Sequence, residues 1–79
     1  MEQDNLFLTK DLSEAGAILA CGSKLLRLDK ESNFFWFVFE NKILCEQISN
    51  AYWNGELQVS AKDYATAIKN LKDRLFSRR

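Results

Sequence analysis

The feature that most constrains the fold is an unbroken run of six aromatic and β-branched residues at positions 34–39, Phe-Phe-Trp-Phe-Val-Phe. Such residues favour strands, and successive side chains of a strand point to opposite faces of its sheet. One face therefore carries Phe35, Phe37 and Phe39, and the other carries Phe34, Trp36 and Val38. Because both faces are apolar, either both are covered in the fold or one is left for a partner.

The neighbouring segments predict a small antiparallel sheet around this strand. Lys24 to Asp29 is predicted as one strand and Asn33 to Glu40 as the next, and the polar residues 29–33 between them form a turn. The two strands should form a β-hairpin spanning residues 24–40. Leu6 to Thr9 is a short additional strand, and Leu57 to Val59 is a brief extended segment that is a candidate for a fourth.

Three amphipathic helices are predicted from capping signals and from apolar periodicity. Asp11, with Glu14 three residues later, forms a capping box for a helix that stops at Gly22, and Thr9 is a competing cap. Asn41 caps a second helix that ends near Tyr52-Trp53-Asn54-Gly55. Ser60 and Asp63 form a second capping box for the last helix. That helix repeats apolar residues with a period near 3.6 from position 61 to position 76.

The expected fold class is α+β, in the order β-α-β-β-α-(β)-α, with the hairpin at the centre and the amphipathic helices packed against it. A chain of 79 residues is long enough for one domain, so we predict a single domain over residues 1–79 with frayed termini at 1–5 and 77–79. A hydrophobic content of 47% with ten aromatic residues excludes a disordered chain.

Residue types that carry common chemistry are few. The chain has no histidine, its three glycines are isolated, and its two cysteines, Cys21 and Cys45, lie far apart. These facts exclude Ser-His and Cys-His catalysis, the usual zinc ligand sets and a Gly-rich phosphate loop. We therefore expect no enzyme, no cofactor and no metal site. No segment resembles a signal peptide or a membrane span, which predicts a protein of the reducing cytoplasm.

The two faces of the aromatic strand admit two interpretations. A sheet of three or four strands accommodates about two helices per face, because strands lie ~4.8 Å apart and a helix is ~10 Å across. With three helices predicted, the last one is expected to cover the second face, which would make the strand part of the core on both sides. This is the interpretation that we favour from the sequence.

The other interpretation is a platform for single-stranded nucleic acid. The expected element order is that of ferredoxin-like domains, including the RRM, whose third strand stacks bases on aromatic side chains. Written from Ser32, the strand reads S-N-F-F-W-F-V-F. Phe34, Trp36 and Phe39 occupy the aromatic positions of the RRM pattern, whereas its basic, glycine and small positions hold other residues.

Two further sets of residues are candidates for contacts with a partner or a nucleic acid. Trp53, at the end of the second helix, either anchors that helix to the core, which we favour, or contributes to a binding patch. Six of the eleven basic residues lie between positions 62 and 79. Three of them, Lys72, Arg74 and Arg78, are candidates for contacts with the phosphates of a nucleic acid. The alternative is that their positive charges only stabilise the C-terminal end of the last helix.

Several residues taken together resemble a family of small uncharacterised proteins from bacteria and their mobile elements. The resemblance covers about Leu6 to Phe76. It is carried by the following residues and segments: Phe7-x-Thr9-x-Asp11-Leu12, Ala15, Leu19, Gly22, Phe37-Val38-Phe39-Glu40, Tyr52-Trp53-Asn54-Gly55, Val59, Tyr64 and Leu71-Lys72. It implies a compact stand-alone domain of unknown function, and it brings no activity, ligand or catalytic residue with it.

The sequence therefore favours a non-enzymatic binding module that acts through a protein partner or through its own dimer. The alternative is a single-stranded nucleic-acid binder. The candidate contact residues of the two hypotheses are Phe34, Trp36, Trp53, Lys72, Arg74 and Arg78.

Overall fold

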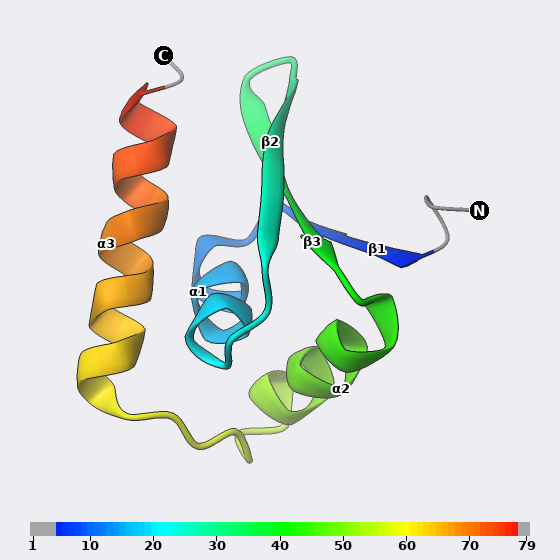
Figure 1. Ribbon diagram of the computed structural model, residues 1–79, viewed down its shortest axis with the longest axis vertical. Coiled ribbons are helices and arrows are strands. Elements are labelled where there is room, and N and C mark those ends of the chain that lie inside the picture. The colour runs from blue at the N-terminus through cyan, green and yellow to red at the C-terminus, as the bar shows by residue number, and fades with distance from the viewer. Residues whose placement is uncertain (1–4, 78–79) are drawn as a thin grey trace.

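The fold, seen in a computed structural model that describes residues 5–77, is a three-stranded sheet with three helices (Figure 1). The elements are β1 (Leu6–Thr9), α1 (Leu12–Ala20), β2 (Leu25–Glu31), β3 (Phe34–Glu40), α2 (Lys42–Trp53) and α3 (Ala61–Ser77). The order is β-α-β-β-α-α, which confirms the α+β class and the hairpin. The candidate fourth strand at Leu57–Val59 was wrong, because these residues form no strand and the Leu57 side chain packs against the core instead.

The aromatic strand β3 is the centre of the sheet. The strand order is β1-β3-β2, and both neighbours run antiparallel to β3. The hairpin between β2 and β3 closes with Glu31 opposite Phe34, which leaves the two-residue loop Ser32-Asn33. Ser32 has a φ of 51°, a left-handed conformation that tight hairpin loops require. A register irregularity between Leu25 and Arg27 marks a bulge in β2, one of the two edge strands.

The predicted helix caps form as the sequence indicates. The Asp11 carboxylate accepts a hydrogen bond from the Glu14 N–H at 2.8 Å, and the Asn41 side chain accepts one from the Leu44 N–H at 3.3 Å. The Ser60 hydroxyl does the same for the Asp63 N–H at 3.0 Å. Each bond satisfies one of the N–H groups that a helix leaves unpaired at its start.

All three helices lie on one side of the sheet. The core cluster combines Phe37 and Phe39 of β3 with buried residues of α1, α2, α3 and β2, and Phe7 and Phe35 pack against it. Within this cluster, Ile18 and Phe39 are completely buried. The side chains that face this layer of helices therefore come from one face of β3, which we call the covered face.

The helix α3 packs beside α1 and does not cover the second face of the sheet (Figure 1). Gly16 of α1 makes the close approach possible, because a Cβ atom at this position would lie 2.4 Å from Ile68 Cδ1 of α3. The prediction that α3 covers the second face was wrong. The reason is physical: α3 buries its apolar stripe against the small residues of α1 and, through Leu71, against the existing core.

Of the residues predicted to fray, positions 1–4 and 78–79 lie outside the described residues. Ser77 is the last residue of α3, and its hydroxyl donates a hydrogen bond to the Asp73 carbonyl at 3.0 Å. Within residues 5–77, no helix is long and apolar enough to cross a membrane.

Candidate functional site

The most distinctive surface of the molecule is the second face of the sheet, which we call the open face. Strand register places Phe34, Trp36 and Val38 of β3 on this face, with Leu8 of β1 and with Arg27, Asp29 and Glu31 of β2. None of the helices in the described part of the chain packs on it. A face of this kind on an antiparallel sheet is normally polar, so its apolar centre requires an explanation.

The centre of the open face is a pair of aromatic rings beside a fully buried valine. The rings of Phe34 and Trp36 meet edge to face, with centroids 5.5 Å apart and an interplanar angle of 76°. Val38 has no exposed surface, and Leu8 and Arg27 lie opposite it on the two neighbouring strands. Phe34 and Trp36 are half-buried, and Leu8 is 45% exposed. The sheet itself thus orders these side chains with no helix above them.

The charges around this apolar centre are mixed, with a small acidic excess. The surrounding residues include two basic ones, Lys10 and Arg27, and three acidic ones, Asp29, Glu31 and Glu40. The Lys10 ammonium lies 4.8 Å from the centre of the Phe34 ring, and Arg27 pairs with Asp29 at 2.9 Å. By register, Asp29 lies opposite Trp36 and Glu31 lies opposite Phe34. Carboxylates therefore border both aromatic rings.

A buried carboxylate on the other side of the sheet fixes the position of Trp53. Glu14 of α1 is 7% exposed and accepts hydrogen bonds from three side chains. The donors are the Thr9 hydroxyl at 2.6 Å, the Trp53 indole N–H at 3.0 Å and the Ser49 hydroxyl. These bonds tie α2 to α1 and β1. Sequence reasoning assigned Glu14 to a capping box, but its carboxylate does not return to the Asp11 N–H, which donates to Thr9 instead.

The Trp53 side chain therefore serves as an anchor through its nitrogen, although 60% of the residue remains exposed. Its ring also meets Tyr52 edge to face, with centroids 4.9 Å apart. The sequence predicted an anchor through burial of the ring, whereas the contact that the structure shows is the hydrogen bond of the indole N–H. Trp53 lies among the helices and not on the open face.

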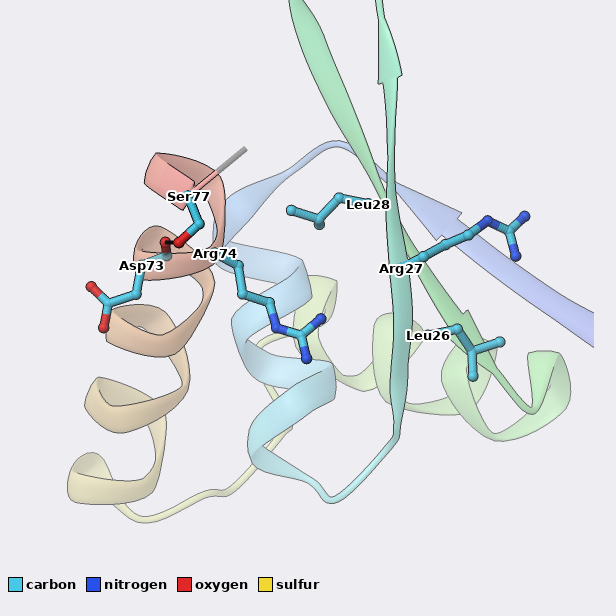
Figure 2. Close-up of a pocket in the computed structure, with 6 residues that line it drawn as sticks. All are labelled: Leu26, Arg27, Leu28, Asp73, Arg74 and Ser77. Atoms are coloured by element: carbon cyan, nitrogen blue, oxygen red, sulfur yellow. Dashed lines mark hydrogen bonds between the residues drawn. The ribbon is translucent and has the colours of Figure 1, made fainter. Parts of the chain in front are cut away.

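The basic candidates lie on α3, within the layer of helices. Lys72 lines an apolar hollow with Leu12, Leu75 and Phe76. Arg74 lines a second hollow, of about 390 Å³, between α3 and β2 (Figure 2). The fold thus brings Phe34 and Trp36 together but does not bring Lys72 or Arg74 onto the open face. Arg78 lies outside the described residues.

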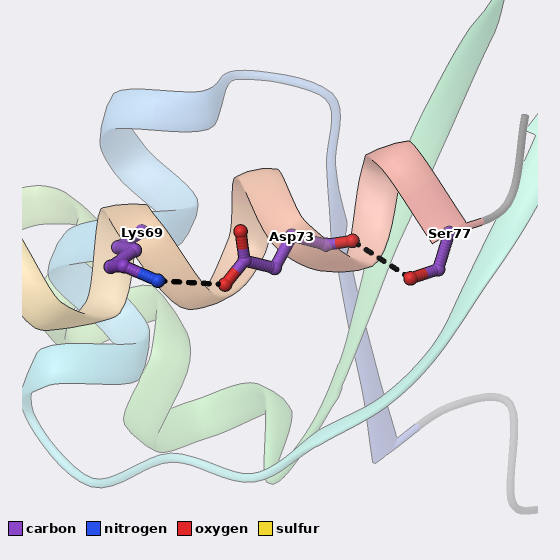
Figure 3. Close-up of polar contacts among 3 residues, drawn as sticks. All are labelled: Lys69, Asp73 and Ser77. Carbon is purple, nitrogen blue, oxygen red and sulfur yellow. Dashed lines mark hydrogen bonds and ion pairs between the residues drawn. The ribbon is translucent and has the colours of Figure 1, made fainter.

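The acidic residue next to Arg74 is already engaged within α3. The Asp73 carboxylate pairs with the Lys69 ammonium at 3.1 Å, one turn away (Figure 3). Arg74 forms no ion pair with any other residue in the described range. Its guanidinium is therefore available to a group that enters the hollow.

The surroundings of the two cysteines raise the pKa of both thiols. Burial raises the pKa of the Cys45 thiol, and the nearby Glu40 carboxylate raises it further, while a hydrogen bond with Ser23 lowers it in part. Partial burial also raises the pKa of the Cys21 thiol. A raised pKa disfavours the thiolate that nucleophilic catalysis or metal binding requires. Within residues 5–77, no cluster of three or more His, Cys, Asp or Glu residues could hold a metal ion.

The chain belongs to the family described as Domain of unknown function (DUF5659), whose model matches residues 4–77. This confirms the resemblance to an uncharacterised family. No curated protein and no solved structure matches the chain.

Proposed function

We propose that this protein is a non-enzymatic binding module and that its open face binds a protein partner with apolar side chains and basic residues at their margin. The observation that carries the proposal is the uncovered aromatic pair, Phe34 and Trp36, on a face that no described helix covers. Ordered rings of this kind lose little conformational entropy on binding and are enriched in binding hot spots.

The charged residues around the open face favour a partner with basic side chains. Glu31, the last residue of β2, lies beside the start of β3, and Glu40 is the last residue of β3. Both are exposed on this face, and neither forms an ion pair with another described residue. A Lys or Arg side chain on the partner would complement them, whereas a phosphate would be repelled. An amphipathic helix with an apolar stripe and basic flanks has this pattern.

The nucleic-acid alternative retains one supporting observation, which is that Phe34 and Trp36 share the open face, as the RRM pattern requires. Against it, carboxylates border both rings, and Lys72 and Arg74 lie within the layer of helices. Because phosphate contacts supply most of the affinity in non-specific nucleic-acid binding, this distribution favours a protein partner.

The two proposals can be separated with the indole N–H signals of the two tryptophans in ¹H-¹⁵N spectra. A synthetic amphipathic helix of leucine and lysine should shift the Trp36 signal and leave that of Trp53 unchanged, and a mixed single-stranded DNA oligomer at low salt should shift neither. The double variant Glu31→Gln, Glu40→Gln should weaken peptide binding, and the double variant Glu46→Gln, Glu56→Gln, which removes two exposed carboxylates elsewhere, is the matched control. A Trp36 signal that moves only with the oligonucleotide would establish the alternative.

The cytoplasm remains the proposed compartment. Cys21 and Cys45 are both free thiols. Reduced cysteines without partners are typical of proteins in a reducing environment.

A further inference from the structure

A second surface that the fold leaves without a partner is the free edge of β2, the longer of the two edge strands. The sheet order is β1-β3-β2, so β2 pairs on one side only, and within residues 5–77 no strand pairs with its other side. In Figure 1, β2 lies in front of β3 and no other element passes in front of it. Unpaired backbone groups on such an edge are a template for another strand.

The backbone groups at the middle of this edge point outward. Glu31 and Phe34 flank a two-residue loop, so they form the hydrogen-bonded pair that closes the hairpin. Alternation along β2 then directs the N–H and C=O groups of Lys30 and Leu28 away from β3. Leu28 is thus positioned to exchange two backbone hydrogen bonds with a strand added at this edge.

The helix α3 stands beside this edge without closing it. The hollow between them is lined by residues 26–28 of β2 and by Asp73, Arg74 and Ser77 of α3. In Figure 2, Leu28 points toward the helices, while Leu26 and Arg27 point to the other side of the strand. A strand added at the edge would therefore continue both faces of the existing sheet.

From this edge we infer that two copies of the chain associate through β2, in antiparallel pairing about a two-fold axis at Leu28. An isologous antiparallel pair must place the axis at a residue, since side chains opposite each other have to share a face. With the axis at residue 28, Arg27 of each copy lies opposite Asp29 of the other. Four alternating charges then form one cluster on the open face.

The charges on β2 exclude the neighbouring registers. An axis at Arg27 or at Asp29 would place like charges directly opposite each other, which destabilises a strand pair. An axis at Lys30 would place two lysines opposite each other and Asp29 opposite Glu31. Among these registers, only the one centred on Leu28 places an apolar residue at the axis and opposite charges on both sides of it.

The same charges would disfavour pairing with an unrelated strand. Charged residues and bulges on edge strands normally prevent indiscriminate association, and β2 carries both. The pattern Arg27-Leu28-Asp29 is self-complementary, however, so the protection does not extend to a second copy. The resulting dimer would join two open faces into one surface of six strands. It does not depend on the proposed binding function.

Charge exchange tests the pairing without touching the core, because Arg27 and Asp29 are exposed and their pair within one chain adds little stability. Sedimentation equilibrium at high micromolar concentration should show a dimer for the natural chain. Arg27→Asp alone and Asp29→Arg alone should each weaken the dimer at least tenfold, since each sets like charges opposite one another. An equimolar mixture of the two variants should recover dimers, because two acidic side chains of the first variant then face two basic side chains of the second at positions 27 and 29.

The controls fix the register and the fold. Glu31→Gln should leave the dimer constant within twofold, because in this register Glu31 lies beyond the Arg27–Asp29 pairs, at the level of the bulge in the other copy, whereas an axis at Asp29 would make Glu31 a partner of Arg27. Circular dichroism should show the same secondary structure for every variant. A natural chain that sediments as a monomer overturns the proposal. The proposal is also overturned if the mixture of the Arg27→Asp and Asp29→Arg variants forms no more dimer than either variant alone.

Discussion

The two faces of β3 have nearly the same composition and different roles. Phe35, Phe37 and Phe39 alternate with Phe34, Trp36 and Val38 along one strand. Phe37 and Phe39 of the first set are buried in the core, and the half-buried Phe35 packs against it. Phe34 and Trp36 of the second set are also half-buried, but no helix lies above them. The comparison teaches that aromatic content alone does not assign a strand face to the core, because the packing of the helices decides it.

The largest expected effect is on the covered face. Phe39→Ala should lower the free energy of unfolding by about 3–5 kcal/mol, because Phe39 is fully buried and its removal leaves a cavity. Urea denaturation followed by circular dichroism measures this loss. Phe39→Leu, which retains most of the volume, should cost clearly less. If Phe39→Ala were almost neutral, the covered face would not be the core.

A second test concerns the bonds that hold the helices on the covered face. Glu14→Ala removes the acceptor of three side-chain hydrogen bonds and should cost about 2–3 kcal/mol, since the buried Thr9 hydroxyl and two less buried donors lose their partner. Trp53→Phe removes one donor only and should cost about half as much or less. Thermal unfolding of both variants gives the comparison. Equal losses would indicate that the indole bond carries the entire effect.

On the open face, Trp36→Ala should cost less than half of the loss from Phe39→Ala, about 1–2 kcal/mol, because Trp36 is only half-buried. The same urea titration measures both variants. A loss as large as that of Phe39→Ala would show that the open face is covered in solution, for instance by another copy of the chain. In that case the urea concentration at the unfolding midpoint should fall when the protein is diluted.

Because α3 packs on α1, it leaves the open face uncovered, and a substitution at Gly16 tests this helix contact. Gly16→Ala should destabilise by about 1 kcal/mol, because overpacking against Ile68 outweighs the gain in helix propensity. Ile68→Val removes the Cδ1 atom that the new methyl group would meet. In the double variant the two changes should therefore partly compensate, which a double-mutant cycle detects as a favourable coupling energy. Strictly additive losses would contradict this contact.

The smallest effect concerns the thiols and does not require a substitution. Ellman's reagent should modify Cys21, which is exposed, before Cys45, which has no exposed surface. Because the pKa of each thiol is raised, the rate at pH 7 should lie below that of free cysteine and should rise with pH as thiolate forms. Cys45 should react at the rate at which the protein opens. Equal rates for the two thiols would place Cys45 at the surface.

Most of the local structure could be predicted from the sequence, because short-range chemistry controls it. Asp11, Asn41 and Ser60 cap helices as their spacing indicates, and Gly22 and Gly55 adopt the positive φ that helix ends favour. The alternation along residues 34–39 correctly placed Phe34 and Trp36 on the same face. The roles of Glu14 and of the β2 edge could not be predicted, since the donors to Glu14 lie up to 39 positions away and strand order is not local.

That the chain forms a small α+β domain around an aromatic strand follows from the sequence alone, because periodicity, caps and turns are local properties of the chain. Which aromatic residues are core and which are surface depends on how the helices pack in three dimensions. The deciding contact is the close approach of Ile68 to Gly16, which gives α3 a place beside α1. The number of helices and the width of the sheet do not predict where α3 packs, because a helix can bury its apolar stripe on another helix as well as on a sheet.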